Sequence, residues 1–304
     1  MYAQCTACDT PKPQPAFTLT PDSRLGAELA HLPLRARAHT AQGHMLSYQH
    51  IYHAGNLADV HKHSLLAWML NYLTQKDKPL TYIETHAGRA LYDLGAEEAL
   101  KTGEAKAGIL QVSQWFKPDH PYARVLTRVK AEDGANAYPG SPLIAAHLLR
   151  PTDTIHLAEL HPREHAALEL AMSPTGAKIH LRDGFETAFA LCPPTPRRGM
   201  LLIDPSYEIK TDYTDIFRHI SKLHRAWNVG IIALWYPILT NRAHEPMLEA
   251  LSAQHADALR HEVRFPPARP GHGMVGSGMF VLNPPYGLAD EARQLGLHYA
   301  GLRS

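Results

Sequence analysis

The residues from Asp204 to Tyr207 (Asp-Pro-Ser-Tyr) follow a short apolar run, 199–203. An uninterrupted run of this length is typical of a strand buried on both faces of a parallel sheet. The amine of adenine is a poor nucleophile because its lone pair is delocalised into the ring. A carboxylate (Asp204) and a main-chain carbonyl (Pro205) that accept its two N–H groups would localise this lone pair, and Tyr207 would stack on the base. The pattern therefore predicts alkylation of a base amine. A proline-containing turn capped by Asp204 is the purely structural alternative.

Two predicted strands before this run, 154–159 and 178–183, also stop at an acid. The carboxyl ends of parallel strands meet at one edge of a sheet, where ligands bind. Glu159 is placed there to accept ribose hydroxyl hydrogens, and Asp183 to accept from an adenine amine beside the Gly184 N–H. Each acid alone is more often a turn or cap residue, but the ordered set of three predicts a nucleotide-like cofactor.

The predicted strands alternate with helices along the chain. A helix runs from its cap at Asn56 to about Gln75, and the first strand, 80–84, ends in a glycine-containing turn at 85–88. After residue 204 we expect a helix at 213–227, a strand at 229–235, a helix near 245–253 and a closing antiparallel hairpin of 258–265 and 277–283. This order predicts an α/β fold with a Rossmann-like, mostly parallel seven-stranded sheet. It matches the class I S-adenosylmethionine-dependent methyltransferases better than a nicotinamide fold, which would carry Gly-x-Gly-x-x-Gly.

Two segments interrupt this alternation. Residues 91–139 separate the first strand from the next helix and contain only helical fragments, so we expect an inserted small helical subdomain. Ser141 is expected as the N-cap of the helix that follows, with Pro142 at its first position and N–H groups that suit a carboxylate. Residues 1–44 are proline-rich and aperiodic, which predicts a mobile N-terminal arm before a methyltransferase domain at 45–304.

Composition narrows the classes of function. The 304 residues carry a net charge of only +1, so nucleic-acid binding requires a local basic face. No apolar run approaches a membrane span and no signal-peptide core is present. Three cysteines do not make a disulfide framework, which indicates the cytoplasm.

The 21 histidines invite a metal interpretation. His61 and His63, however, are two residues apart and fall on different faces of the predicted helix. Cys5 and Cys8 have the spacing of a zinc knuckle without a second pair. We therefore expect no metal site.

A family resemblance rests on stretches in a fixed order from Met45 to about Gly287. They are MLSYQHIYHAGNLADVHKH, ETHAG, YPGSPLIA, AELHP, RDGF, IDPSYE with KTDY, ALWYP and SGMFVLNPP. In these stretches the chain resembles the bacterial 23S ribosomal RNA adenine-2030-N6 methyltransferases, the RlmJ family. The resemblance implies methyl transfer from S-adenosylmethionine to N6 of an adenine in 23S ribosomal RNA, in protein-free or early-assembly form. We expect a cytoplasmic monomer without membrane contact.

The resemblance also implies site residues. Asp204 would be the catalytic acceptor at the adenine amine, and Tyr48 would lie beside the target nucleotide. The S-adenosylmethionine pocket would be lined by His63, His86, Ser141, Glu159, Asp183 and Gly184. Candidate RNA contacts are Arg197, Arg198, Lys210, Arg218, Lys222, Arg225, Arg264 and Arg269.

Departures from the family pattern keep alternatives open. The family usually has Asp-Pro-Pro-Tyr where Ser206 stands here, and Ala-Gly where Arg89-Ala90 follow Gly88. Methylation of adenine in DNA is one alternative. A non-catalytic nucleic-acid-binding protein of DNA uptake or utilisation is the other. A second tetrad, Asn283-Pro-Pro-Tyr, fits the usual adenine-methyltransferase motif better than the first, but we expect it at the opposite edge of the sheet in a structural role.

Overall fold

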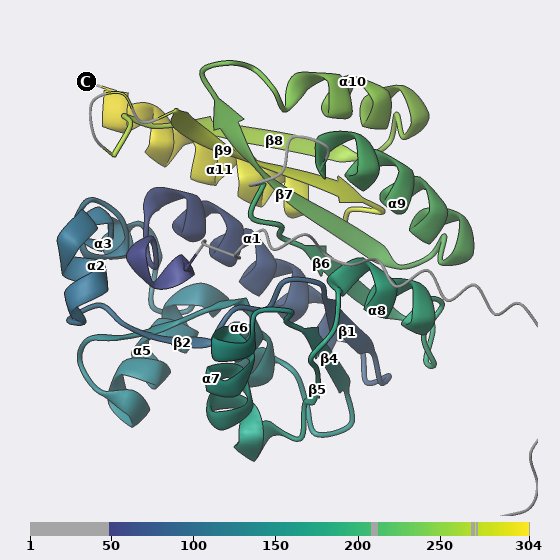
Figure 1. Ribbon diagram of the computed structural model, residues 1–304, viewed down its shortest axis with the longest axis horizontal. Coiled ribbons are helices and arrows are strands. Elements are labelled where there is room, and N and C mark those ends of the chain that lie inside the picture. The colour runs from purple at the N-terminus through teal and green to yellow at the C-terminus, as the bar shows by residue number, and fades with distance from the viewer. Residues whose placement is uncertain (1–48, 208–211, 269–270, 272, 304) are drawn as a thin grey trace, which may run out of the picture. The chain divides into compact units, whose positions relative to one another are not determined.

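The computed structural model describes residues 49–207, 212–268, 271 and 273–303 (Figure 1). The expected arm, 1–44, and Tyr48 lie outside the described residues. The strands are β1 (Thr81–Glu84), β2 (Leu91–Asp93), β3 (Ala137–Pro139), β4 (Thr154–Ala158), β5 (Lys178–His180), β6 (Gly199–Ile203), β7 (Ile231–Leu239), β8 (Leu259–Arg264) and β9 (Met274–Leu282). The helices are α1 (Leu57–Thr74), α2 (Glu97–Thr102), α3 (Glu104–Ala107), α4 (Ile109–Val112), α5 (Pro121–Asp133), α6 (Ser141–Leu148), α7 (Pro162–Met172), α8 (Gly184–Leu191), α9 (Asp212–Ala226), α10 (Glu245–Gln254) and α11 (Leu288–Ala300).

The central sheet has seven strands in the order β5-β4-β1-β6-β7-β9-β8. The first five are parallel to one another. Strand β9 is antiparallel to both of its neighbours, β7 and β8, so the expected closing hairpin is confirmed. This is the sheet of the class I S-adenosylmethionine-dependent methyltransferases, as the order of elements predicted.

Helices cover both faces of the sheet (Figure 1). Side chains along β6 alternate between two apolar clusters because successive residues of a strand point to opposite faces. Met200 and Leu202 join the cluster that contains α1, α5, α6 and α11. Leu201 and Ile203 join the cluster formed with α9 and α10. Burial on both faces explains why this strand reads as a continuous apolar run.

Helix α1 is enclosed by other elements. Its cap is the predicted one, since the Asn56 side chain accepts a hydrogen bond from the Asp59 N–H at 2.9 Å. Thirteen of its 18 residues are buried, and they include charged and polar ones such as Lys62 and Ser64. It packs against α5, α6, α11 and β9. A helix buried on all sides can therefore carry polar groups into the interior, where they need partners.

The insert after β1 is less purely helical than expected. Its two ends, β2 and β3, pair as an antiparallel two-stranded sheet around the helices α2 to α5. Its buried side chains, among them Ile109, Tyr122 and Val129, belong to the same apolar cluster as α1. Strands of three residues are too short for an alternating pattern to be visible in the sequence.

The reversed direction of β9 decides where the second tetrad lies. Asn283 follows the end of β9, and its amide donates to the carbonyls of Asn228 and Gly230 at 2.9 and 2.8 Å. Those two residues precede β7, so Asn283 is at the amino-terminal edge of the parallel strands. The expected location is confirmed, and the hydrogen bonds give Asn283 a structural contact there.

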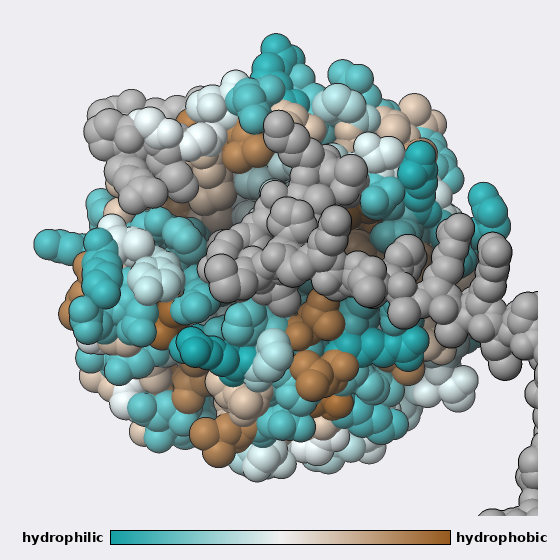
Figure 2. Space-filling view, viewed as in Figure 1, coloured by the Kyte–Doolittle hydropathy of each residue, from teal (hydrophilic) through white to brown (hydrophobic). Residues whose placement is uncertain are grey.

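Figure 2 shows the face viewed in Figure 1 in space-filling form, with hydrophilic side chains over most of it and apolar ones in small separate patches. Scattered exposed apolar side chains are normal for a folded protein.

None of the helices in the described ranges is both long enough and apolar enough to cross a bilayer.

Candidate active site

A cavity of about 660 Å³ opens at the carboxyl edge of the parallel strands. It extends from the ends of β4 and β5, past β1 and β6, to β7 and the start of β9. Its lining includes every predicted site residue that the structure describes, namely His63, His86, Ser141, Glu159, Asp183, Gly184, Asp204 and Tyr207. The volume lies within the range of small-molecule and cofactor sites.

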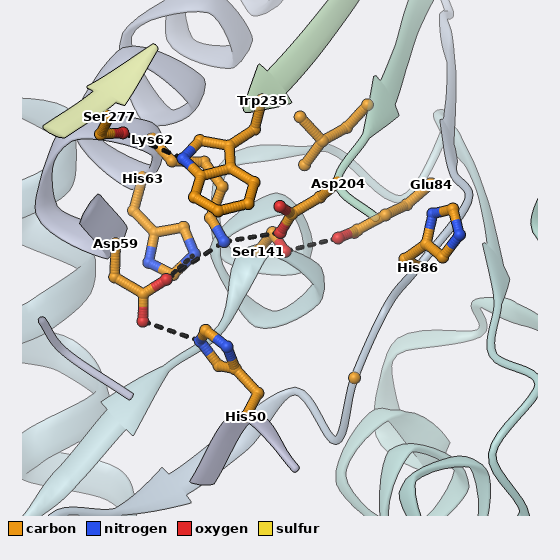
Figure 3. Close-up of polar contacts among 12 residues, drawn as sticks. His50, Asp59, Lys62, His63, Glu84, His86, Ser141, Asp204, Trp235 and Ser277 are labelled. Carbon is orange, nitrogen blue, oxygen red and sulfur yellow. Dashed lines mark hydrogen bonds and ion pairs between the residues drawn. The ribbon is translucent and has the colours of Figure 1, made fainter. Parts of the chain in front are cut away.

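Asp204 is held by a lysine that the sequence did not single out (Figure 3). The Lys62 ammonium lies 2.6 Å from Asp204 Oδ2 and 3.1 Å from Asp59 Oδ1, so it bridges two carboxylates. Asp59 Oδ2 in turn receives the Gly55 N–H and contacts His50 Nε2, each at 2.9 Å. Oδ1 of Asp204 has no hydrogen-bond partner among the described residues, and Asp204 lines the cavity.

Burial and charge oppose each other in this cluster. Burial alone would lower the pKa of Lys62, but Asp204 and Asp59 outweigh it and hold that pKa above its usual value. Burial would likewise raise the pKa of Asp59, but His50, Lys62 and His63 hold it well below its usual value. Lys62 and Asp59 are therefore charged in the interior, and each depends on its partner.

Ser141 is not the N-cap that we expected. Gly140 caps α6, and Ser141 is the first helical residue, with Pro142 second. Its hydroxyl donates instead to Glu84 Oε1 at 2.5 Å (Figure 3). The Tyr82 hydroxyl donates to the other oxygen, Glu84 Oε2, at 2.9 Å. Glu84 ends β1 and is fully buried, and this burial raises its pKa to about 8. Glu84 is 57 residues from Ser141 in the chain, so this hydrogen bond could not be predicted from the sequence around Ser141.

His61 and His63 face different neighbours, as their spacing predicted. His63 Nδ1 contacts the Tyr138 hydroxyl at 2.8 Å, whereas His61 contacts Ser277 and His261. Burial lowers the pKa of His63 to about 3, so the ring is neutral at neutral pH. The residues in the described ranges form no cluster of three or more metal-ligating side chains.

Glu159 lies just after β4 with both carboxylate oxygens fixed by main-chain donors. The Gly88 N–H donates to Oε2 at 2.8 Å and the His161 N–H donates to Oε1 at 2.7 Å. Burial raises the pKa of Glu159 despite these donors. Each oxygen keeps one lone pair for a donor in the cavity, which fits a pair of ribose hydroxyls.

Asp183 caps α8, since its Oδ1 accepts the Glu186 N–H at 2.8 Å. Its other oxygen, Oδ2, accepts no hydrogen bond from a residue in the described ranges. Next to it, Gly184 lies so close to β1 that a Cβ would stand 2.0 Å from the Thr85 carbonyl oxygen. No side chain fits there, so the Gly184 main chain is brought to the cavity wall.

The β7 side of the cavity is aromatic and apolar. Tyr207 has a left-handed backbone (φ 56°), and its hydroxyl donates to the Trp235 carbonyl at 2.7 Å. The Tyr207 ring lies 4.8 Å from that of Tyr213 and 6.0 Å from that of Trp235. Ser206 is exposed, so the departure from Asp-Pro-Pro-Tyr alters no buried contact.

Arg89 does not fill the cofactor loop. Its guanidinium forms a two-point contact with Glu164, at 2.9 Å from Nε and 2.6 Å from Nη2. The carboxylate of Glu164, and not the Arg89 side chain, lines the cavity. The turn itself requires glycine at position 88, where φ is 62° and a Cβ would stand 2.6 Å from the Tyr92 hydroxyl.

Two of the candidate RNA contacts lie away from the cavity. Arg197 and Arg198 directly precede β6 at the amino-terminal edge, and Arg198 donates to the carbonyls of Leu73 and Lys78. Arg218 is paired with Asp215 at 3.2 Å. Lys210 and Arg269 are outside the described residues.

The residues that the sequence argument missed are Lys62, Asp59, His50, Glu84 and Trp235. One signal was available: Asp59 and Lys62 are three residues apart on a predicted helix, which is the spacing of an ion pair on one helix face. The Lys62–Asp204 contact spans 142 residues and had no local signal.

Comparison with known proteins gives the family. A family model described as "Ribosomal RNA large subunit methyltransferase D, RlmJ" matches residues 77–301. The chain belongs to the RlmJ family.

Two curated relatives named Ribosomal RNA large subunit methyltransferase J are similar to most of the chain. The one from Escherichia coli (strain K12) is 40% identical over 254 residues, which cover 81% of this chain and 90% of that protein. The one from Haemophilus influenzae is 37% identical over 259 residues, 83% of this chain and 92% of that protein. The resemblance to the RlmJ family seen in the sequence motifs is thereby confirmed.

A solved structure supports the same membership. The crystal structure of protein LPL1258 from Legionella pneumophila is 34% identical and superposes with a TM-score of 0.75. The match covers 82% of this chain and 94% of that protein. The fold of this RlmJ-family chain is therefore shared over nearly the whole of a solved relative.

Proposed function

We propose that this chain transfers a methyl group from S-adenosylmethionine to N6 of an adenine in 23S ribosomal RNA. The observation that carries the proposal is the position of Asp204 and the Pro205 carbonyl between two unlike halves of one cavity. Toward β4 and β5 the lining consists of acids with free lone pairs, and toward β7 it is aromatic. Membership of a ribosomal RNA methyltransferase family supports the nucleic acid as substrate.

The acidic half fits S-adenosylmethionine. Glu159 would accept the ribose hydroxyls, Asp183 the adenine amine, and the open wall at Gly184 would admit the adenine ring. Ser141 and His86 would lie along the methionine portion. When bound, S-adenosylmethionine supplies an electrophilic methyl group on a positively charged sulfur.

The other half would receive the target base. Asp204 Oδ1 and the Pro205 carbonyl would accept the two N–H bonds of the amine, which localises its lone pair on nitrogen. N6 then gains the methyl group as the bond between that methyl group and sulfur breaks, and N6 loses one proton to Asp204 or to water. Catalysis of this kind rests on positioning and on polarisation of the amine.

Lys62 orients the acceptor. Its ammonium binds Oδ2 of Asp204, which would leave Oδ1 to accept an N–H of the amine. A carboxylate held at one oxygen cannot rotate away when the cofactor enters. Asp59 fixes Lys62 from the other side, so the acceptor is placed by a chain of charges that begins on α1.

The test is methylation in vitro of unmodified 23S ribosomal RNA with isotope-labelled S-adenosylmethionine, followed by digestion and mass spectrometry of the nucleosides. Labelled N6-methyladenosine is expected from the wild type and not from Asp204→Ala. A DNA oligonucleotide of the same sequence tests the nearest alternative. Efficient labelling of DNA alone, or label on another nucleoside, would contradict the proposal.

Calorimetry separates a non-catalytic binding protein from an enzyme. An enzyme is expected to bind S-adenosylmethionine in the absence of RNA, whereas a protein with a degenerate loop at Arg89 would not. We further propose that the chain acts as a monomer on protein-free or early-assembly RNA in the cytoplasm, without membrane contact. Sedimentation of the protein with and without RNA tests the oligomeric state.

A further inference from the structure

Trp235 stands on β7 beside Asp204 and borders the cavity (Figure 3). Its ring lies 5.5 Å from the Lys62 ammonium, close enough for a cation–π contact. Its indole N–H is 2.9 Å from the Ser277 hydroxyl on β9. The ring is thus fixed at two points, and Trp235 lines the same cavity as Asp204.

The Ser277 hydroxyl belongs to a longer chain of hydrogen bonds. Ser277 Oγ lies 2.8 Å from His61 Nδ1, and His61 Nε2 lies 2.9 Å from His261 Nδ1. The chain therefore links Trp235 on β7, Ser277 on β9, His61 on α1 and His261 on β8. Both Ser277 and His61 are fully buried.

The direction of each hydrogen bond follows from the donors. An indole N–H can only donate, so Ser277 Oγ accepts from Trp235. The described residues offer the Ser277 hydrogen one further acceptor, His61 Nδ1, and a buried hydroxyl needs one. Burial holds the pKa of His61 well below its usual value, so the ring is neutral and carries its hydrogen on Nε2. His61 then donates to His261 Nδ1.

We propose that Ser277, His61 and His261 are positioning residues for Trp235, and that Trp235 is a second surface, beside Tyr207, on which the target adenine stacks. The proposal rests on the proposed function, because it names the substrate contact of the same site. An indole bound at its nitrogen cannot turn about its side-chain bonds. The ring is therefore already oriented before the base leaves its neighbours, which reduces the ordering cost of binding.

The first experiment measures stacking directly, with RNA that carries 2-aminopurine at the adenine methylated by the wild type. A 2-aminopurine stacked on an indole is quenched. We expect brighter complexes with Ser277→Ala and Trp235→Ala than with the wild type, at saturating protein. Equal brightness of the wild-type and Trp235→Ala complexes would overturn the stacking surface.

The second experiment asks whether Ser277 acts through Trp235. Loss of one hydrogen bond should raise KM for RNA about fivefold in Ser277→Ala, while kcat and S-adenosylmethionine affinity stay near wild type. In the Trp235→Phe background, which lacks the indole N–H, Ser277→Ala should have no added effect on KM. The same KM increase in both backgrounds would show a general structural role and contradict the proposal.

Ser221→Ala is the matched control. The Ser221 hydroxyl on α9 lies 2.9 Å from the Phe217 carbonyl oxygen and 2.7 Å from the Gln254 side chain on α10. Ser221→Ala therefore removes the same group as Ser277→Ala, but outside the hydrogen-bond chain that ends at Trp235. It should change neither KM nor the fluorescence. If the wild type itself methylates no RNA, the proposed function fails, and the stacking proposal fails with it. If the wild type methylates RNA and the two readouts do not move, only the stacking proposal fails.

Discussion

Lys62 connects Asp204, at the expected reaction centre, with Asp59 on α1. A buried cation between two acids is strongly held, but each member becomes an uncompensated charge when its partner is removed. The consequence is that stability and catalysis share the same residues at this site, and variants must be chosen to separate the two.

Lys62→Met should lower the free energy of unfolding by about 3–5 kcal/mol, because Asp59 and Asp204 lose their cation. Adding Asp59→Asn removes one of the stranded charges and should restore part of the loss. Urea unfolding measures both variants. Methyl transfer should stay impaired in the double variant, because Asp204 Oδ2 still lacks its anchor. Full recovery of transfer in the double variant would show that Lys62 serves stability alone.

Glu159→Ala should weaken S-adenosylmethionine binding by about 1–3 kcal/mol, the scale of hydrogen bonds to a charged group. Calorimetry measures the change. Glu169→Ala is a control, because Glu169 is an exposed acid on α7. Unchanged affinity in Glu159→Ala would remove Glu159 from the cofactor site.

Glu84 should make stability depend on pH. Burial raises its pKa from 4.5 to about 8, so the folded protein binds this proton more tightly than the unfolded chain. Its contribution to stability is fully present below its unfolded pKa and is lost as the pH rises through about 8.

Glu84→Gln keeps the shape and stays neutral. Compared with the wild type, it should be about equally stable near pH 4.5 and more stable above about pH 8. Thermal unfolding of both proteins across this interval provides the measurement. Parallel curves for wild type and variant would mean that another group controls the dependence.

The elements illustrate what sequence can and cannot predict. Strand patterns that stop at an acid located β4, β5 and β6 and their shared edge. Burial of β6 on both faces is visible in the sequence as a continuous apolar run. The sequence contains no comparable signal for the β2–β3 pair or for the hydrogen bond of Ser141. Three-residue strands carry no period, and the hydroxyl of Ser141 is claimed by Glu84, which only the folded chain brings near. Helix α11 was also missed, although its residues after Gly287 are compatible with a helix.

Strand direction separates the two tetrads, and this can be tested. Asp204→Ala should abolish methyl transfer while S-adenosylmethionine still binds. Asn283→Ala loses two hydrogen bonds to main-chain carbonyls and should cost about 1–3 kcal/mol of stability, with transfer within a few-fold of wild type. Methyl-transfer assays measure activity, and calorimetry measures S-adenosylmethionine binding, for both variants. Reversed outcomes would mean that the active site has been assigned to the wrong edge.

For the whole chain, the segment before Met45 is predicted to be dispensable. It is rich in proline and lacks a periodic apolar pattern, so it has no means of building a core of its own. A chain that begins at Met45 should keep full turnover and the same melting temperature. A large drop in turnover at an unchanged melting temperature would contradict this and give the segment a role in the reaction.

Helix α1 has a consequence for synthesis of the protein. It carries Lys62 and His63 and is made before β1, yet it packs on β9 and α11, which are made much later. The Tyr299 hydroxyl donates to the Leu57 carbonyl at 2.6 Å across 242 residues. A nascent chain therefore contains Lys62 and His63 early, but it still lacks β9 and α11, against which the helix that carries them packs. The active site can be completed only when the last helix has left the ribosome.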